Sequence, residues 1–198
     1  METVSKVTIV SSALVRLGEV SISSFTEKTK IDPLANLYYV QRDALLRSHP
    51  WNCAVKRKIL AAKVAPAIPE QVDYANTFAL PSDFLRLLSV GNYGEEPDYK
   101  IEGREILCDE TALRIRYIYR NEDESTWDTM LIEAMQLAMI AAMAYAVTQS
   151  TSKEQAAYAA LSTYLKMARA VDGQEDPPEF VGDHFLLNSR FGSYYAQR

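Results

Sequence analysis

The sequence predicts an α+β protein, with helices toward both ends of the chain and strands between them. Apolar side chains recur at helical spacing in the first 50 residues and again after residue 125. In the middle they alternate with polar side chains, which is typical of a half-exposed sheet. The chain has 198 residues, 48% of them hydrophobic, enough to bury one sizeable core. The expected division is 1–50 and 125–172 for the helical part, 51–124 for the β-rich part and 173–198 for an extended C-terminal arm.

Two helices are expected in the first segment. The first ends at Gly18, because glycine is common just past helix C-termini. The second begins with the cap and first-turn proline of Asp32-Pro33. It ends near Ser48, because Pro50 disfavours helical backbone in the residue before it. The expected buried stripes are Val7, Val10, Leu14 and Leu17 in the first helix, and Leu34, Leu37, Tyr38 and Leu45, widened by Val40 and Ala44, in the second.

Short strands with local connections predict a mostly antiparallel sheet in the middle segment. "FLRLLSV" follows the turn signal "PSD", and "YKIEGREIL" predicts a hairpin that turns at Gly103. "LRIRYIY" is the clearest strand. The expected faces are Cys53, Val55, Ile59 and Ala61 opposite Lys56 and Lys58 in the first strand, and Leu113, Ile115, Tyr117 and Tyr119 opposite Arg114, Arg116 and Ile118 in "LRIRYIY".

Two further helices are expected after residue 125, where Ser125-x-x-Asp128 and Ser152-x-x-Gln155 resemble capping boxes. The first helix is apolar almost all round and should be the most buried element. Its longest nearly uncharged run, Ala134 to Val147, is shorter than the roughly 20 residues of a membrane span, so we expect no membrane partner. The second helix should cover the first with the stripe Ala157, Leu161, Tyr164, Leu165 and Ala168.

Composition and motifs predict neither a catalytic residue, nor a metal site, nor a cofactor. The net charge of −5 disfavours general nucleic-acid binding, which needs an excess of Lys and Arg on one surface. Cys53 and Cys108 form no CxxC pair, so free buried thiols are expected. His49 and His184 are the only histidines, and a helix break separates His49 from Cys53. "NEDESTWDTMLIE" lacks the glycine and the final glutamate of a calcium loop.

Two clusters of charged residues could either form a functional site or simply be solvated surface charges. Glu95, Glu96 and Asp98 would suit glycoside chemistry, but their Gly/Pro-containing loop favours a solvated turn. Lys56, Arg57 and Lys58 would suit phosphate contacts. Strand alternation places Arg57 on the face opposite the two lysines. A charged sheet face or a subunit contact is therefore the expected use of this run.

Several short sequence motifs are weak indicators of a protein family when taken singly, but their order and spacing together are more specific. They are the "HPWN" corner that begins at His49, the turn "ALPSDFLR", and "TWD" before the long apolar helix. Together they resemble the head-to-tail adaptor proteins of tailed phages, most closely the tail tubular protein A type of short-tailed phages. The resemblance covers roughly Thr3 to Val171. It departs at Cys53, where an aromatic residue is expected.

The resemblance implies a mainly helical fold, a four-helix bundle with a β-rich antiparallel insertion between helices 2 and 3. It implies a structural protein and no enzyme: a ring of twelve copies that docks on the portal protein and contacts the downstream nozzle protein of the tail. Genomic DNA would pass through its lumen without sequence-specific binding. The protein would be assembled in the cytoplasm of the host bacterium and would reside at the head-tail junction of the virion.

The resemblance also gives roles to two segments. Pro50 and Trp51 would form a structural hinge between the helical and β-rich parts, with Trp51 buried as a packing anchor. The aromatic arm would contact the portal or a neighbouring subunit, because exposed aromatic patches usually mark interaction sites. The arm residues expected to make these contacts are Phe180, Phe185, Phe191, Tyr194 and Tyr195.

Two alternatives stay open. A virion-associated hydrolase of the cell wall or of polysaccharide would bring carboxylates together in a pocket. A small helical interaction protein of the host would be a monomer with its arm folded back.

Overall fold

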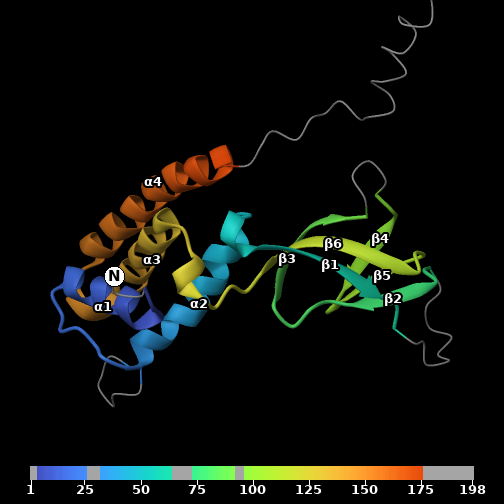
Figure 1. Ribbon diagram of the computed structural model, residues 1–198. Coiled ribbons are helices and arrows are strands. Elements are labelled where there is room, and N and C mark those ends of the chain that lie inside the picture. Colours follow the sequence, from blue (N-terminus) through green and yellow to red (C-terminus); the bar gives the residue numbers. More distant parts are fainter. Residues whose placement is uncertain (1–3, 26–31, 64–72, 92–95, 176–198) are drawn as a thin grey trace, which may run out of the picture. The chain divides into compact units, whose positions relative to one another are not determined.

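The computed structural model describes residues 4–25, 32–63, 73–91 and 96–175. In sequence order two helices precede the strands and two helices follow them, an order that the colours of Figure 1 trace. The elements are α1 (Lys6–Leu17), α2 (Asp32–Ser48), β1 (Val55–Ala61), β2 (Asn76–Ala79), β3 (Phe84–Val90), β4 (Tyr99–Glu102), β5 (Glu105–Cys108), β6 (Ala112–Tyr119), α3 (Thr129–Thr148) and α4 (Thr151–Glu175).

The predicted four-helix bundle with a β-rich insertion is wrong. The described residues form four helices and two three-stranded antiparallel sheets, with about 51% helix and 23% strand. The strand orders are β1-β6-β3 and β2-β5-β4. The helices do not share one four-sided core: α1, α2 and α4 each pack mainly on α3. The buried residues of α4 are only Ala168 and Asp172, so α4 covers α3 as an outer layer.

The chain divides into two compact units. The helical unit comprises Met1–Lys56, Asp83–Arg86 and Tyr117–Glu175, and it contains all four helices. The sheet unit comprises Arg57–Ser82 and Leu87–Arg116 within the described part of the chain. The division crosses β1, β3 and β6, so these three strands contribute residues to both units.

The boundaries of the first two helices confirm the local signals. Ser5 caps α1 through a capping box with Thr8, and Gly18 ends it with a φ of 92°, a left-handed conformation that favours glycine. α2 runs from Asp32 to Ser48. The expected widening of the α2 stripe is wrong, because Val40 and Ala44 are exposed. The buried side chains among the described part of α2 are Tyr38, Arg42, Leu45 and Leu46.

The start of each later helix differs from the expected capping box. α3 is capped by Asp128, whose carboxylate accepts a hydrogen bond from the Met130 backbone N–H. Ser125 lies upstream in a short 3₁₀ turn that Asp123 caps. Ser152 lies inside α4, which begins at Thr151. Both predicted boxes are wrong, because the Asp128 side chain supplies the cap of α3, and because α4 starts two residues earlier than a cap at Ser152 would place it.

α3 is the core helix of the helical unit. It has more buried residues than the other helices have in their described parts, as its apolar composition predicts. By length and composition it is also the one helix in the described ranges that is apolar enough to cross a membrane, and 44% of the apolar window is buried. Core helices pass the same test. Because α1, α2 and α4 pack on α3, we interpret it as a core helix.

α4 covers α3 with the predicted stripe, and the two helices lie side by side (Figure 1). Ala168 is buried, and the other four stripe residues are half-buried. Tyr158 and Met167 are exposed. α4 continues through Gly173 to Glu175, so the expected change of structure at Gly173 does not occur there. Residues 176–198 lie outside the described residues.

The sheet unit contains the predicted hairpin. β4 and β5 pair antiparallel, with Glu102 opposite Glu105 and Gly103 in the turn at a φ of 58°. β2 pairs with the other side of β5. Phe78, Ile106 and Cys108 are buried in this sheet. Both cysteines are free thiols, but Cys53 is only partly buried, and that burial raises its pKa.

The other sheet corrects one predicted face. Leu113, Ile115 and Tyr117 are buried as expected on β6. On the edge strand β1, however, Ile59 is 62% exposed and Leu60 is buried. Ile118, predicted to share the outer face of β6, is also buried. Simple alternation therefore does not describe the end of β1, nor the last residues of β6, which belong to the helical unit.

Candidate functional site

The "HPWN" corner is fastened to the last turns of α4 by Asp172. The carboxylate Oδ2 lies 3.0 Å from His49 Nε2, and Oδ1 accepts a hydrogen bond of 3.1 Å from the Asn52 backbone N–H. The Asn52 side-chain amide donates to the Asp172 carbonyl oxygen at 3.0 Å. Asp172 is only 8% exposed. A single buried carboxylate therefore connects two segments that lie 120 residues apart in the sequence.

Trp51 fills the inside of this corner. It is 1% exposed, and its indole N–H donates to the Leu45 carbonyl oxygen at 3.1 Å. Its ring meets the His49 ring edge to face, with centroids 4.8 Å apart. Burial lowers the pKa of His49, although the Asp172 carboxylate opposes this shift. The corner is therefore a packed, hydrogen-bonded structural joint, and the hinge role of Pro50 and Trp51 stays a prediction.

The "PSD" turn forms a second joint in the helical unit, centred on Asp83. Its carboxylate accepts hydrogen bonds from Lys56 Nζ at 3.0 Å and from the Tyr117 hydroxyl at 3.1 Å. Lys56 Nζ also lies 3.6 Å from the centroid of the Tyr119 ring. Desolvation and the neighbouring Asp83 carboxylate raise the pKa of Tyr117 to about 12. Lys56 therefore has a structural role in this joint, as the ion-pair partner of Asp83 and the cation over the Tyr119 ring.

The ionisation of Asp83 gives a testable pH dependence. Partial burial alone would raise the pKa of this carboxyl, but the hydrogen bonds from Lys56 and Tyr117 outweigh it and lower the pKa. A folded pKa below the unfolded one stabilises the fold at pH values above the usual Asp range, near 3.9, and this contribution is lost as the pH falls through the lowered pKa. We expect Lys56→Ala to raise the pKa of Asp83, measured by carboxyl-carbon NMR titration. An unchanged midpoint would contradict this; Lys58→Ala is the matched control.

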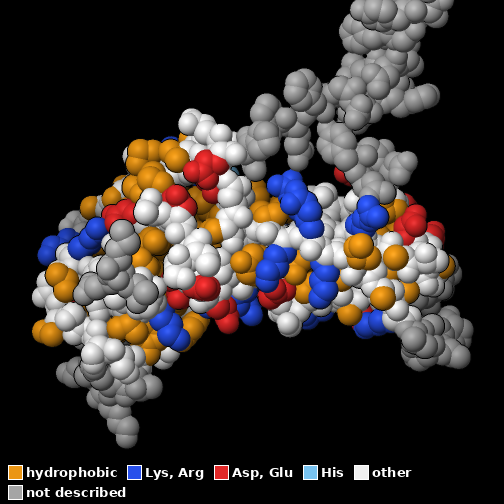
Figure 2. Space-filling view, viewed as in Figure 1, with side chains coloured by type: hydrophobic (Ala, Val, Ile, Leu, Met, Phe, Trp, Pro, Cys, Tyr) orange, Lys and Arg blue, Asp and Glu red, His pale blue; other side chains and the backbone are white. Residues whose placement is uncertain are grey.

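The basic groove lies on the β1-β6-β3 sheet within the sheet unit. It is an open groove of about 660 Å³. Lys and Arg side chains gather over these strands on the face shown in Figure 2. The cationic residues of the groove are Arg57 and Lys58 from β1 and Arg114 and Arg116 from β6.

The structure divides the predicted charged face Lys56, Arg57 and Lys58. Lys56 joins the Asp83 cluster, whereas Arg57 and Lys58 line the basic groove. Within the described ranges no carboxylate lies within 4.0 Å of the Arg57 or Lys58 side chain. The sequence interpretation missed Arg114 and Arg116 as members of the same cluster. The alternation in "LRIRYIY" placed them together, but only strand pairing brings them to β1.

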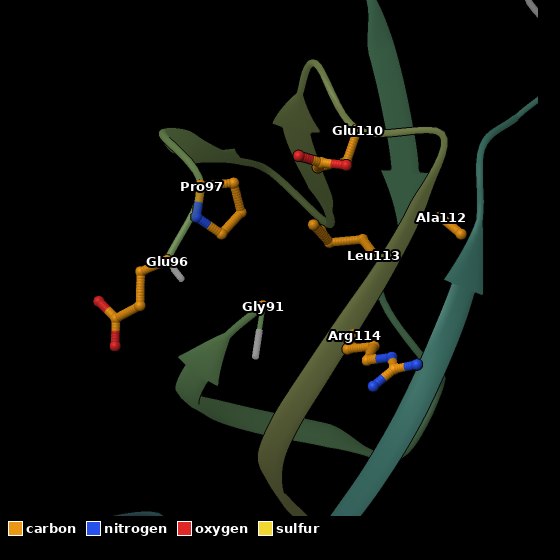
Figure 3. A pocket seen from close by; sticks show the side chains of 7 residues that line it. All are labelled: Gly91, Glu96, Pro97, Glu110, Ala112, Leu113 and Arg114. Carbon is orange, nitrogen blue, oxygen red and sulfur yellow. The ribbon is translucent and has the colours of Figure 1, made fainter. Parts of the chain in front are cut away.

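A smaller pocket of about 410 Å³ lies beside the groove in the same unit. Figure 3 shows Leu113 and Pro97 directed toward its centre and Glu96 directed away from Pro97. The Arg114 side chain leaves β6 on the side away from Leu113, which agrees with its place in the groove next to β1 residues. Besides Pro97 and Leu113, the smaller pocket is lined by the charged residues Glu96, Glu110 and Arg114, and it shares Glu96 and Arg114 with the groove.

The remaining candidates do not form a cluster. Glu96 and Asp98 are exposed, and Glu95 lies outside the described residues. His184 and the arm aromatics Phe180, Phe185, Phe191, Tyr194 and Tyr195 also lie outside them. In the described part of the chain no group of three or more His, Cys, Asp or Glu side chains is placed to hold a metal ion.

The arrangement can bind an anionic group at the basic groove, and it holds the helical unit together at the Asp172 and Asp83 joints. No protein-family model and no curated protein matches this chain.

Proposed function

We propose that this protein is a structural component of a tailed-phage virion that joins the portal to the tail and continues the DNA channel as a ring. One observation carries the proposal: the three sequence pieces that resemble phage adaptors, "HPWN", "ALPSDFLR" and "TWD", all contribute to packing and hydrogen bonding in the structure. Each piece supplies buried or hydrogen-bonded residues to the helical unit. Buried and hydrogen-bonded residues stabilise the fold, and an assembly subunit depends on a stable fold to present its contact surfaces.

The contacts of the three pieces support this interpretation one by one. In "HPWN", His49 and Asn52 both bond to Asp172, and Trp51 is buried. In "ALPSDFLR", the Asp83 side chain bonds to two partners. In "TWD", Trp127 is buried and Asp128 caps α3. None of these side chains points a reactive group into the groove or the smaller pocket.

The proposal assigns partners by the same resemblance. The ring of twelve copies binds the portal protein on one side and the nozzle protein on the other, and DNA passes through its lumen without sequence-specific contacts. The arm beyond α4 supplies aromatic side chains for the portal or a neighbouring subunit. The protein is assembled in the cytoplasm of the host bacterium and becomes part of the head-tail junction.

Co-sedimentation with portal rings tests the proposal. The full chain, mixed with purified portal rings of the same phage, should sediment with them and saturate near one copy per portal subunit. The triple variant Phe191→Ala, Tyr194→Ala, Tyr195→Ala should lose most of this binding, because each truncation removes a large apolar contact. Tyr158→Ala, which removes an exposed tyrosine from α4, is the matched control. A full chain that stays in the supernatant at every ratio would rule the proposal out.

A further inference from the structure

Three arginines of the helical unit have no carboxylate partner among the described residues, and all three lie near the "HPWN" corner. The other arginines of this unit form ion pairs; they are Arg16, Arg42 and Arg120. The three exceptions, Arg47, Arg86 and Arg169, are the corner arginines. Within the described ranges no carboxylate oxygen lies within 4.0 Å of their guanidinium groups.

Hydrogen bonds to neutral groups hold two of the corner arginines at the end of α2. Arg47 donates to the Leu85 carbonyl oxygen, and Leu85 directly precedes Arg86 in β3. Arg169 of α4 donates from Nη2 to the Ser48 hydroxyl at 3.1 Å, at the last residue of α2. Three separate elements therefore bring one guanidinium group each to the same end of α2, and each group keeps donors that these bonds do not use.

The environment of Arg86 and Arg169 makes a missing anionic partner costly. Both residues are half-buried, and the Nε of Arg169 is buried without an acceptor in the described part of the chain. Burial is the main cause that lowers the pKa of His49, and the charges of Arg169 and Arg86 lower it further. The dipole of α2 favours a cation at Arg47, in its last turn, but it does not account for the other two. An anionic group that covers half-buried, unpaired guanidinium groups would therefore stabilise the fold.

The chain supplies acids of its own at this place, directly after α4. The helix ends at Glu175, whose carboxylate accepts a hydrogen bond of 3.5 Å from the Asn52 side chain, so the chain leaves α4 at the corner. Asp176 is the next residue, and Glu179 follows after two prolines. Four residues span at most about 14 Å, which keeps Glu179 within reach of the corner. Residues 176–189 contain three acids and no Lys or Arg.

We propose that Asp176 and Glu179 bind the corner arginines of their own chain and fix the start of the C-terminal arm at the "HPWN" corner. A tethered segment acts at an effective concentration of about millimolar, so a few ion pairs suffice to hold it. A second copy would need a far larger contact, because stable protein interfaces use about 20–30 residues a side. The inference concerns a single chain and does not rest on the proposed function. It leaves the later aromatic residues of the arm for other contacts.

Carboxyl-carbon NMR titration of the full chain tests the contact at the two acids. Ion pairing lowers the pKa of a carboxyl, so Asp176 and Glu179 should titrate below their ordinary range. Arg86→Gln with Arg169→Gln removes both charges but keeps hydrogen-bond donors, and it should raise the two midpoints by about 0.5 pH units, as for exposed ion pairs. Lys153→Gln with Lys166→Gln removes the same charge from exposed positions of α4 and should leave the midpoints unchanged.

Proteolysis distinguishes a bound segment from charges that merely lie close together. Chymotrypsin cleaves after aromatic residues, and the Phe180–Val181 bond directly follows Glu179. The two Arg→Gln changes should raise the initial cleavage rate at this bond about threefold relative to the Phe191–Gly192 bond, because they favour the open form of the segment. High salt should have the same effect on the wild-type chain.

Every combination of results decides for or against the inference. Raised midpoints together with faster cleavage after Phe180 support it. Unchanged midpoints, or raised midpoints with an unchanged ratio of the two cleavage rates, would overturn it. Protection of the Phe180–Val181 bond that disappears on dilution of the wild-type chain would assign the acids to a second copy, and the own-chain contact would then be wrong.

Discussion

Trp51→Ala should lower the free energy of unfolding by about 3–5 kcal/mol, as expected for truncation of a fully buried tryptophan. The side chain is 1% exposed and packs against the His49 ring. Removing it leaves a cavity that α2 and the Asp172 joint prevent from closing, and the Leu45 carbonyl oxygen loses its hydrogen bond from the indole. Urea unfolding followed by circular dichroism measures the change. A loss below about 1 kcal/mol would contradict the packing role.

Two variants separate the packing of Trp51 from its hydrogen bond. Trp51→Phe keeps most of the apolar volume but removes the donor, so we expect a loss of about 1–2 kcal/mol. Tyr158→Ala truncates a half-exposed aromatic residue on α4 and should cost about 0.5 kcal/mol or less, as for other surface sites. If the three variants lose similar amounts, stability does not depend on this corner.

Asp172→Ala should cost about 3 kcal/mol of unfolding free energy, because hydrogen bonds to a charged group are worth about 1.5–3 kcal/mol and the variant removes the acceptor of two of them. The carboxylate bonds to His49 and to the Asn52 backbone N–H, and it is 8% exposed. Asp172→Asn keeps one acceptor oxygen and should cost roughly half as much.

The same unfolding assay supplies the control for Asp172. Lys166→Ala lies on the same helix at an exposed position and should change stability by less than about 0.5 kcal/mol. Hydrogen exchange adds a local readout: Asp172→Ala should speed exchange of the Asn52 amide more than that of amides in α3. Equal effects on both regions would show that Asp172 does not act as a joint at this corner.

Local signals predicted much of the secondary structure. Gly18 ends α1, Asp32 and Ser48 bound α2, and Gly103 turns the β4-β5 hairpin, as expected. Each of these outcomes depends on backbone preferences of a few adjacent residues. The apolar composition of α3 and the stripe on α4 likewise predicted which helix is central and which one covers it.

The packing of the helices and strands against one another could not be predicted from the local capping and turn signals. The strands form two sheets, and the helices pack around α3 without forming a four-helix bundle. Helical periodicity shows which face of a helix is apolar, but it does not show how much of that face will be covered. α4 has a clear apolar stripe, yet Ala168 is the one stripe residue that is buried; the other buried residue of this helix is the polar Asp172.

By itself the sequence determined where α1 ends, where α2 begins and ends, where the hairpin turns, and which residues could carry charge or pack. Only the tertiary structure decided that the Asp172 carboxylate would bond to His49 and Asn52. It also decided that Arg57 and Lys58 of β1 would line the same groove as Arg114 and Arg116 of β6. Local backbone conformation is set by neighbouring residues. The partner of a buried carboxylate or of an exposed cation is instead set by chain segments more than 50 residues away, through strand pairing and helix packing that no local pattern encodes.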